Sequence, residues 1–208
     1  MSVHIIEHPL IKEKMSILRD RETSSRLFKE CLDEVVMLMA FDVTKDLALD
    51  TYSVQTPLME TEGYKVHKPI VLVPILRAGL GFLDGMRRII PYAHVGHIGM
   101  ARNEETLLPE EYYAKFPSCL KEATVIVLDP MLATGGSACD AIEALKKRGA
   151  TDLRMVSLVG APEGLAKMAE EQPDVPIYLA CLDDKLNEHG YILPGLGDAG
   201  DRLFGTDE

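Results

Sequence analysis

The fold is decided by the stretch Thr124-Val125-Ile126-Val127-Leu128-Asp129-Pro130-Met131-Leu132-Ala133-Thr134-Gly135-Gly136-Ser137. Residues 123–128 form an apolar, β-branched run, which predicts a buried strand. Residues 138–148 have the apolar spacing of an amphipathic helix, and Gly149 follows as a stop signal. A carboxylate, Asp129, therefore stands at the end of a strand, and a Thr-Gly-Gly-Ser turn leads from it into a helix.

This turn predicts an anion site. Small residues let backbone N–H groups approach an anion closely, and a helix start adds unpaired donors and the positive end of the helix dipole. The neighbouring Asp129 would repel a phosphate but suits hydroxyl groups or metal-bound water, so the pair indicates a sugar phosphate. The turn lacks the Gly-Lys-Ser/Thr ending of a P-loop and the G-x-G-x-x-G spacing of dinucleotide sites. A Gly-Gly turn also serves as a plain connection, so the assignment depends on the rest of the chain.

From residue 70 onward, apolar strands alternate with helical patterns. We expect strands at Ile70–Ile75, His94–Met100, Thr124–Asp129, Leu153–Gly160 and Val175–Leu182, and helices at Gly79–Ile90, Ser137–Arg148 and Pro162–Glu171. This alternation predicts an α/β fold, with a parallel sheet flanked by helices through right-handed crossovers. Ligands of such sheets bind beyond the carboxyl ends of the strands, where Arg77, Arg102, Asp129 and residues 160–162 all fall.

The remaining segments are less regular. Residues 23–41 predict an amphipathic helix, capped by its first residue, that serves packing or dimer formation. Residues 51–56 alternate as an edge strand, and residues 60–68 are expected to be a polar connection. Residues 104–115 predict a mobile flap or hairpin. Residues 183–208 are rich in glycine and show little periodicity, and so long an irregular tail indicates a functional segment.

Four segments together carry a resemblance to a known family. They are residues 71–81 (VLVPILRAGLG), 99–106 (GMARNEET), 129–137 (DPMLATGGS) and 186–201 (LNEHGYILPGLGDAGD). In this order they closely resemble the uracil phosphoribosyltransferases of the type I phosphoribosyltransferase family. The resemblance runs over nearly the whole chain, from His8 to Thr206.

The resemblance implies both an architecture and a reaction. It implies one phosphoribosyltransferase domain over residues 1–208, with an α/β core at about 70–182, a flexible flap and a hood at 183–208 that grips the base. The implied reaction belongs to pyrimidine salvage. It joins uracil to 5-phospho-α-D-ribose 1-diphosphate (PRPP), giving UMP and diphosphate. Such a step must hold the diphosphate, align the sugar with the base and exclude water.

The resemblance also implies a set of PRPP-binding residues: Arg77, Arg102, Asp129, Pro130, Met131, Leu132, Ala133, Thr134, Gly135, Gly136, Ser137 and Asp198. Arg77 lies in the diphosphate loop, where its planar fork matches diphosphate oxygens; the alternative is an ion pair with Asp84. Arg102 has a similar alternative, a surface ion pair with Glu104 or Glu105. Asp129 is expected to accept the ribose hydroxyls.

For uracil, the resemblance implies contacts with Ile192, Gly197, Asp198 and Ala199. A rigid loop presents backbone donors and acceptors that match uracil, whereas cytosine would leave buried groups unpaired. Asp198 and Arg102 are the predicted catalytic residues. Asp198 orients the base, stabilises the charge of the transition state or acts as a general base, and the sequence leaves these roles open. We expect Asn187-Glu188-His189 to hold the hood by structural hydrogen bonds.

No metal ligated by the chain itself is expected. Many phosphoribosyltransferases have two consecutive acids where this chain has Asp129-Pro130, so Mg²⁺ is expected to arrive with diphosphate oxygens and waters. The four cysteines are scattered without a Cys-x-x-Cys pair, which indicates neither zinc nor a disulfide framework. GTP activation occurs in some members of the family, so the resemblance also implies GTP as an effector.

Composition limits the partners and the compartment. The 208 residues carry a net charge of −11, which opposes binding to a nucleic-acid backbone. There is no apolar run of ~20 residues and no signal peptide, so we expect a cytoplasmic protein without membrane contact. The family favours homodimers or higher homo-oligomers. The alternative functions are a phosphoribosyltransferase for another base such as a purine, an RNA-binding pyrimidine regulator, and a catalytically inactive homologue.

Overall fold

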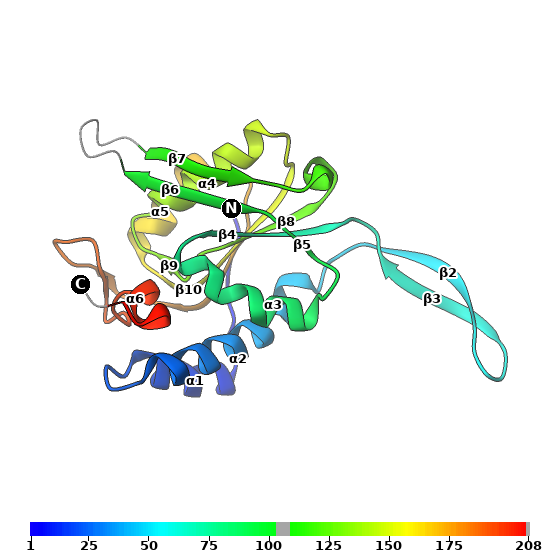
Figure 1. Ribbon diagram of the computed structural model, residues 1–208, viewed down its shortest axis with the longest axis horizontal. Coiled ribbons are helices and arrows are strands. Elements are labelled where there is room, and N and C mark those ends of the chain that lie inside the picture. Colours follow the sequence, from blue (N-terminus) through cyan, green and yellow to red (C-terminus); the bar gives the residue numbers. More distant parts are fainter. Residues whose placement is uncertain (103–108, 207–208) are drawn as a thin grey trace.

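The centre of the computed structural model, which describes residues 1–102 and 109–206, is a mostly parallel sheet (Figure 1). Its strands follow the order β1-β11-β10-β8-β4-β6-β7, with β5 beside β4 and β9 beside β10. Only β6 and β7 pair in antiparallel fashion in this sheet, within the described residues. The strands are β1 (Val3–Ile5), β4 (Ile70–Leu76), β5 (His94–Val95), β6 (His97–Arg102), β7 (Pro109–Lys115), β8 (Thr124–Leu128), β9 (Met131–Leu132), β10 (Asp152–Gly160) and β11 (Ile177–Leu182).

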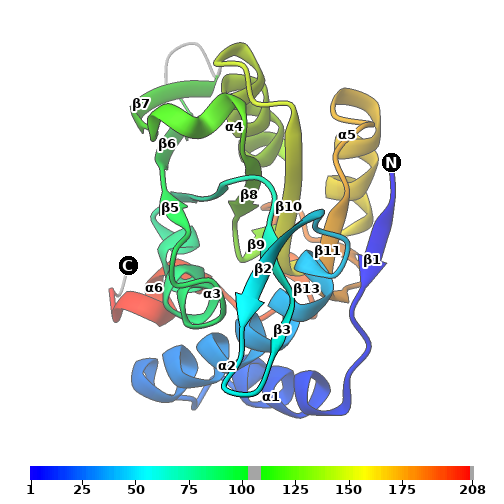
Figure 2. The same ribbon diagram turned by 90° about the vertical axis from the view of Figure 1, so that its right-hand side faces the viewer.

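Helices cover both faces of this sheet, as the sequence predicted (Figures 1 and 2). They are α1 (Pro9–Arg19), α2 (Ser25–Thr44), α3 (Leu83–Ile89), α4 (Gly136–Lys147), α5 (Pro162–Glu171) and α6 (Ala199–Phe204), with short 3-10 helices η1 (Ala78–Phe82) and η2 (Ser118–Lys121). Helices α1, α2, α3 and α6 pack on one face, and α4 and α5 pack on the other.

Alternate residues of the central strands pack into two separate hydrophobic cores, one on each face of the sheet. In β4, Ile70 and Leu72 pack against α1, α2 and α3, whereas Val71 and Val73 belong to the core under α4 and α5. Successive strand residues point to opposite faces, and a sheet covered on both faces therefore needs a continuous apolar run. For this reason, the apolar runs of β4 and β8 predict these two strands directly.

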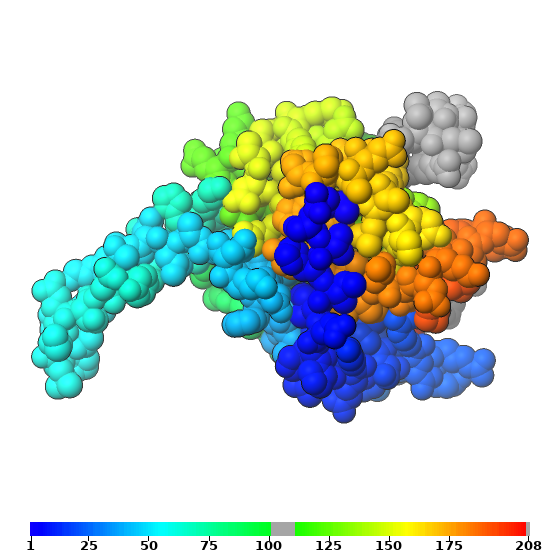
Figure 3. Space-filling view, turned by 180° about the vertical axis from the view of Figure 1, so that it is seen from behind, coloured from blue at the N-terminus to red at the C-terminus, as the bar shows by residue number. Residues whose placement is uncertain are grey.

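A two-stranded arm projects from the body of the protein (Figures 1 and 3). Strand β2 (Leu49–Gln55) pairs antiparallel with β3 (Glu60–Val66) along the whole of both strands. The prediction of a polar connection over residues 60–68 was wrong. Because most side chains of β3 are exposed, the strand lacks the apolar alternation that marks a half-buried strand.

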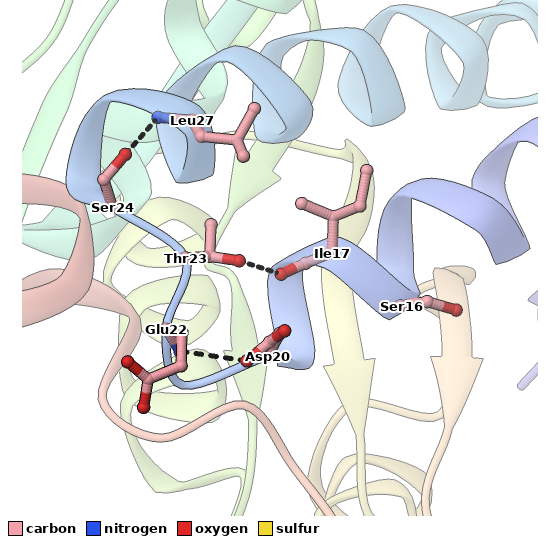
Figure 4. Close-up of a pocket in the computed structure, with 7 residues that line it drawn as sticks. All are labelled: Ser16, Ile17, Asp20, Glu22, Thr23, Ser24 and Leu27. Atoms are coloured by element: carbon pink, nitrogen blue, oxygen red, sulfur yellow. Dashed lines mark hydrogen bonds between the residues drawn. The ribbon is translucent and has the colours of Figure 1, made fainter.

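The N-terminal segment differs from the prediction in two ways. The long helix α2 begins one residue after Ser24, whose hydroxyl accepts a hydrogen bond from the Leu27 N–H at 3.4 Å (Figure 4). Thr23 is therefore not the cap; its hydroxyl donates to the Ile17 carbonyl at 2.6 Å instead. Strand β1 and helix α1 precede this helix and were not predicted. Nine buried residues of α2 confirm its packing role.

Other differences concern where elements begin and end. The predicted strand at residues 94–100 is two strands, β5 and β6, and the predicted helix at 79–90 is η1 followed by α3. The tail is more regular than predicted: it contains strands β12 (Lys185–Leu186) and β13 (Ile192–Leu193), which pair with each other, and helix α6. Within the predicted flap, residues 104–108 lie outside the described residues, and residues 109–115 form β7.

Candidate active site

Three parallel strands end at the same edge of the sheet. The pairing places Pro74 of β4 beside Leu128 of β8, and Leu128 beside Val156 of β10. Arg77 and Asp129 therefore emerge next to each other from neighbouring strands. Arg102 ends β6, which adjoins β4, and its side chain lies outside the described part of the chain. The strand-end arrangement predicted from the sequence is present for the backbone of these positions.

The first half of the Asp129–Ser137 loop is fixed by pairing with β10. Met131 and Leu132 form the short strand β9, and the Leu132 side chain is buried. The Pro130 carbonyl accepts hydrogen bonds from the Leu158 and Val159 N–H groups, both at 3.0 Å. Because the Pro130 carbonyl and the residues of β9 are hydrogen-bonded to β10, this half of the loop is held in place. It therefore fixes the position of the turn that follows.

The second half of the loop forms the turn that the sequence predicts to bind an anion. Gly135 has φ of +79°, a left-handed conformation that glycine adopts without a steric penalty, and it precedes the first residue of α4. The Thr134 hydroxyl accepts a hydrogen bond from the Gly136 N–H at 3.4 Å. The first turn of α4 presents N–H groups toward this loop, and the Thr134 and Ser137 side chains are exposed.

Helix α5 packs closely under the turn. A Cβ atom on Gly164 would lie 2.5 Å from the Ala133 carbonyl oxygen, and one on Gly135 would lie 2.9 Å from the Gly164 carbonyl oxygen. Both approaches require glycine. Glu163, one residue earlier in α5, accepts a hydrogen bond from the Leu186 N–H at 3.0 Å. The turn and the C-terminal segment are thus built on the same helix.

Asp129 has an unusual carboxyl group. Burial raises its pKa to about 7, and the nearby charge of Asp198 acts in the same direction. A hydrogen bond of 3.4 Å from the Met131 N–H to Asp129 Oδ1 opposes the shift. The effect of Asp198 on Asp129 indicates that the C-terminal segment lies near the strand-end loop. An acid with a pKa near neutrality is typical of a functional site.

Arg77 points toward the C-terminal segment. Its Nη2 atom lies 3.1 Å from Asp201 Oδ1, and its side chain remains 59% exposed. The predicted alternative partner was wrong, because Asp84 pairs with Lys29 at 2.6 Å. The Leu76–Arg77 peptide bond is cis. Two residues later, a Cβ atom on Gly79 would lie 2.3 Å from the Leu128 carbonyl oxygen, which fixes this loop against the end of β8.

The C-terminal segment closes over the turn. Asn187 Oδ1 accepts hydrogen bonds from the N–H groups of His189 and Tyr191, both at 2.9 Å, which matches the structural role predicted for Asn187. A Cβ atom on Gly190 would lie 3.8 Å from the Thr134 methyl carbon. The loop at 187–191 therefore adjoins the predicted phosphate turn.

Of the predicted base-binding residues, Ile192 lies in β13, and Gly197, Asp198 and Ala199 lie at the start of α6. Asp198 is the cap of this helix: its Oδ1 atom accepts a hydrogen bond from the Asp201 N–H at 2.9 Å, and its side chain is exposed. Ile192 and Ala199 are 4% and 3% exposed and belong to the core. Their side chains are thus occupied by packing, and only their backbone groups are available for hydrogen bonds to a ligand.

Four residues around this site were missed by the sequence analysis. Asp201 holds Arg77, and Arg19, Asp183 and Arg202 anchor the C-terminal segment to α1. Asp183 directly follows the end of β11, so the rule that points to strand ends would have found it. Arg19 gave no signal, because α1 itself was not recognised.

Other features of the surface lie away from this site. A hollow of about 510 Å³ between the end of α1 and the start of α2 is lined by Ser16, Ile17, Asp20, Glu22, Thr23, Ser24 and Leu27, none of them a predicted site residue (Figure 4). Among residues 1–102 and 109–206, no group of three His, Cys, Asp or Glu side chains has metal-site geometry. In the same residues, no helix combines the length and apolar character needed to cross a membrane.

The sheet, the glycine turn at its carboxyl edge and the C-terminal cover define a phosphoribosyltransferase of the type I fold. A hypoxanthine-guanine phosphoribosyltransferase from Bacillus anthracis has a similar fold, with a TM-score of 0.53 and 15% identity over 76% of this chain and 80% of that one. A solved protein from Aquifex aeolicus is far more similar, with a TM-score of 0.92 and 39% identity over 99% of each chain.

Sequence comparisons identify the family to which the chain belongs within this class of enzymes. The family model described as uracil phosphoribosyltransferase matches residues 5–206. The uracil phosphoribosyltransferase of Shouchella clausii is 56% identical over 205 residues, which are 98% of both chains. That of a Thermoanaerobacter species is 54% identical over 206 residues, 99% of this chain and 98% of its own. The chain belongs to the uracil phosphoribosyltransferase family.

Proposed function

We propose that this enzyme transfers the phosphoribosyl group of PRPP to uracil, giving UMP and diphosphate in pyrimidine salvage. The observation that carries the proposal is that the C-terminal segment lies against the strand ends: Asp201 pairs with Arg77, and the charge of Asp198 raises the pKa of Asp129, which follows β8. One carboxyl group lies beside a phosphate turn and the other beside a base loop. A site that must align a sugar phosphate with a base requires this juxtaposition.

The 5′-phosphate of PRPP fits the turn at residues 133–137. The N–H groups at the start of α4 donate to phosphate oxygens, and the exposed hydroxyls of Thr134 and Ser137 add two further donors. Gly135 and Gly136 keep side chains out of the space that the phosphate needs. The ribose 2′- and 3′-hydroxyls then reach Asp129, directly or through water.

The diphosphate takes the place beside Arg77 and Arg102. Arg77 supports this role because its side chain is exposed at the strand end and its acidic partner, Asp201, is replaceable by diphosphate oxygens. When bound with PRPP, Mg²⁺ neutralises part of the diphosphate charge. Asp129 and Asp198 would contact the waters of such an ion rather than the ion itself.

Uracil takes the place at the hood, residues 183–208, where Ile192 and Gly197 to Ala199 face it with their backbone groups. A fixed loop discriminates against cytosine, because the amino group of cytosine would leave a buried donor unpaired. Asp198 lies where the N1 atom of uracil forms its bond to the sugar. We assign it either the orientation of N1 or the removal of the N1 proton, and Arg102 the stabilisation of the leaving diphosphate.

Several further properties follow from the same proposal. Strand β7, the described part of the predicted flap, pairs with β6 at Glu111 to Lys115, and a flap over the bound substrates stays a prediction from the family resemblance. The exposed apolar side chains of the β2–β3 arm, among them Leu58 at 94% exposed and Met59 at 68%, support a homodimer or a higher homo-oligomer. Activation by GTP and a cytoplasmic location stay predictions from the family resemblance.

The direct test is UMP formation from labelled uracil and PRPP with Mg²⁺, with cytosine, hypoxanthine and orotate in parallel. We expect product from uracil alone. Product from hypoxanthine would instead support a purine enzyme, and no product with any base, with or without GTP, would support a catalytically inactive homologue. A gel-shift assay at two salt concentrations checks the remaining alternative, an RNA-binding regulator.

A further inference from the structure

Arg19, the last residue of α1, makes a two-pronged ion pair with Asp183, which follows β11. Arg19 Nη2 lies 2.6 Å from Asp183 Oδ1, and Arg19 Nη1 lies 2.8 Å from Asp183 Oδ2. The Asp183 side chain is only 4% exposed and that of Arg19 is 26% exposed. Paired N–H···O bonds of this kind fix geometry as well as charge, which a flexible ammonium group does not.

The same pair holds both backbone polar groups of Gly195. The Gly195 carbonyl accepts a hydrogen bond from Arg19 Nη1 at 2.7 Å, and the Gly195 N–H donates to Asp183 Oδ2 at 2.8 Å. The position also requires glycine, because φ is +63° and a Cβ atom would lie 2.1 Å from the Ile192 carbonyl oxygen. The position of Gly195 is therefore fixed by Arg19, by Asp183 and by the close approach of the Ile192 carbonyl.

A second arginine fixes the next residue of the chain. Arg202 Nη1 donates to the Leu196 carbonyl at 2.8 Å, and its Nη2 donates to the Asp20 carbonyl at 2.6 Å. The guanidinium carbon of Arg202 also lies 4.6 Å from the centre of the Phe28 ring. Gly195 and Leu196 immediately precede the proposed base loop, Gly197 to Ala199. The backbone that leads into this loop is therefore anchored to the C-terminal end of α1.

We propose that Arg19 and Asp183 are positioning residues that set the uracil specificity of this site from outside it. This inference rests on the proposed function. Neither residue is assigned a contact with substrate. They fix Gly195, which in turn sets where the backbone donors and acceptors of residues 197–199 meet the base. Because hydrogen-bond readout depends on fractions of an ångström, a small displacement of this loop weakens uracil binding while the phosphate turn stays intact.

The test uses the conservative variant Arg19→Lys in the full-length enzyme. Lysine keeps the charge but cannot bond both Asp183 oxygens and the Gly195 carbonyl at once. We expect the KM for uracil to rise about tenfold or more, the KM for PRPP to change less than about twofold, and discrimination against cytosine to fall. A merely structural role would move both KM values together or neither.

Arg154→Lys is the matched control. Arg154 is also a buried arginine that binds one carboxylate, Asp46, and one backbone carbonyl, that of Val43, but it lies near the opposite end of β10 from the site. We expect this control to leave the ratio of the two KM values unchanged, even where its melting temperature falls. An equal change of that ratio in both variants would overturn the proposal.

Asp183→Asn provides a second variant if Arg19→Lys does not fold. Asparagine keeps an oxygen that accepts from the Gly195 N–H but loses the charge that holds Arg19, so we expect the same selective rise in the KM for uracil. Unchanged uracil kinetics in a folded Asp183→Asn enzyme would overturn the proposal. A wild-type enzyme that makes no UMP would instead contradict the proposed function, and this outcome is distinct because it needs no variant.

Discussion

Arg77 and Asp201, 124 residues apart in the sequence, are joined by an ion pair of 3.1 Å between Nη2 and Oδ1. The pair links the loop after β4 to helix α6 of the hood. A Cβ atom on Gly200 would lie 3.7 Å from the Ala78 Cβ atom, so the two segments also pack directly. The loop that follows β4 and the helix that follows the proposed base loop are therefore in direct contact.

Asp201→Asn tests whether PRPP must displace this carboxylate from Arg77. Removing the negative charge frees Arg77 and reduces repulsion of the diphosphate, so we expect the KM for PRPP to fall about two- to fivefold, the range of a partly exposed ion pair. Steady-state kinetics with saturating uracil measure this. Asp84→Asn is the control, because Asp84 pairs with Lys29 instead. A rise in the KM for PRPP would mean that Asp201 orients Arg77 for binding.

Asp198→Asn tests the proposed catalytic residue without disturbing the helix. Asparagine caps a helix as well as aspartate, so the hydrogen bond from the Asp201 N–H and the melting temperature should survive. Loss of a group that orients or deprotonates N1 should reduce kcat by about 10²-fold or more, while PRPP binding stays measurable by calorimetry. An unchanged kcat would rule out a catalytic role for Asp198.

Gly136→Ala tests the phosphate turn. The nearest atom to a Cβ at this position is Thr134 Oγ1 at 3.7 Å, so the folded enzyme accommodates the methyl group. We expect an unchanged or slightly higher melting temperature, because alanine favours a helix, together with a KM for PRPP raised about tenfold. Unaltered PRPP kinetics would place the phosphate elsewhere.

Gly79→Ala should lower the stability of the protein, in contrast to Gly136→Ala. A Cβ atom there would lie 2.3 Å from the Leu128 carbonyl oxygen and 3.1 Å from the Pro74 Cα atom, and neither backbone atom moves easily. We expect a loss of stability of about 1–3 kcal/mol, which lowers the melting temperature of a chain of this size by ~2–4 °C for each kcal/mol. Calorimetry measures the shift, and a wild-type melting temperature would contradict the geometry.

The sequence predicts the parallel core well because burial on both faces leaves little choice of residues. β4, β8 and β10 were placed to within a residue or two, and α5 spans the predicted residues 162–171. The rule that ligands bind at carboxyl strand ends then predicts Arg77 and Asp129 as site residues from the sequence alone. These predictions use only local patterns and one general property of parallel sheets.

The parts that local patterns miss are held by distant contacts. Helix α6 has six residues, too few to be stable alone, and Arg202 ties it to the carbonyls of Leu18 and Asp20. Strand β3 has polar residues because most of its side chains are exposed. The partner of Arg77 could not be predicted because Asp201 lies 124 residues away in the sequence, and only the tertiary packing of the hood against the sheet edge places the two side chains together.

The last prediction concerns the partly buried carboxyl group of Asp129. Its pKa is about 7 in the folded chain and close to 3.9 in an unfolded one, because burial and the charge of Asp198 disfavour the ionised form. Between these values the folded state binds more protons than the unfolded state. The free energy of unfolding therefore falls as the pH rises from about 4 to about 7, and the stabilising effect of the proton is lost above pH 7.

Asp129→Asn removes this titration, because the amide stays neutral at every pH. We expect the melting temperature of the ligand-free variant to exceed that of wild type by less at pH 5, where the folded chain still holds the Asp129 proton, than at pH 8. At pH 8 the variant should melt higher by a few degrees, since about 1 kcal/mol corresponds to ~2–4 °C in a chain of this size. Calorimetry of both proteins across this range isolates Asp129, because all other titrating groups are shared. A constant difference in melting temperature from pH 5 to pH 8 would mean that Asp129 ionises as an ordinary carboxyl group, and that the meeting of strand end and hood leaves its charge solvated.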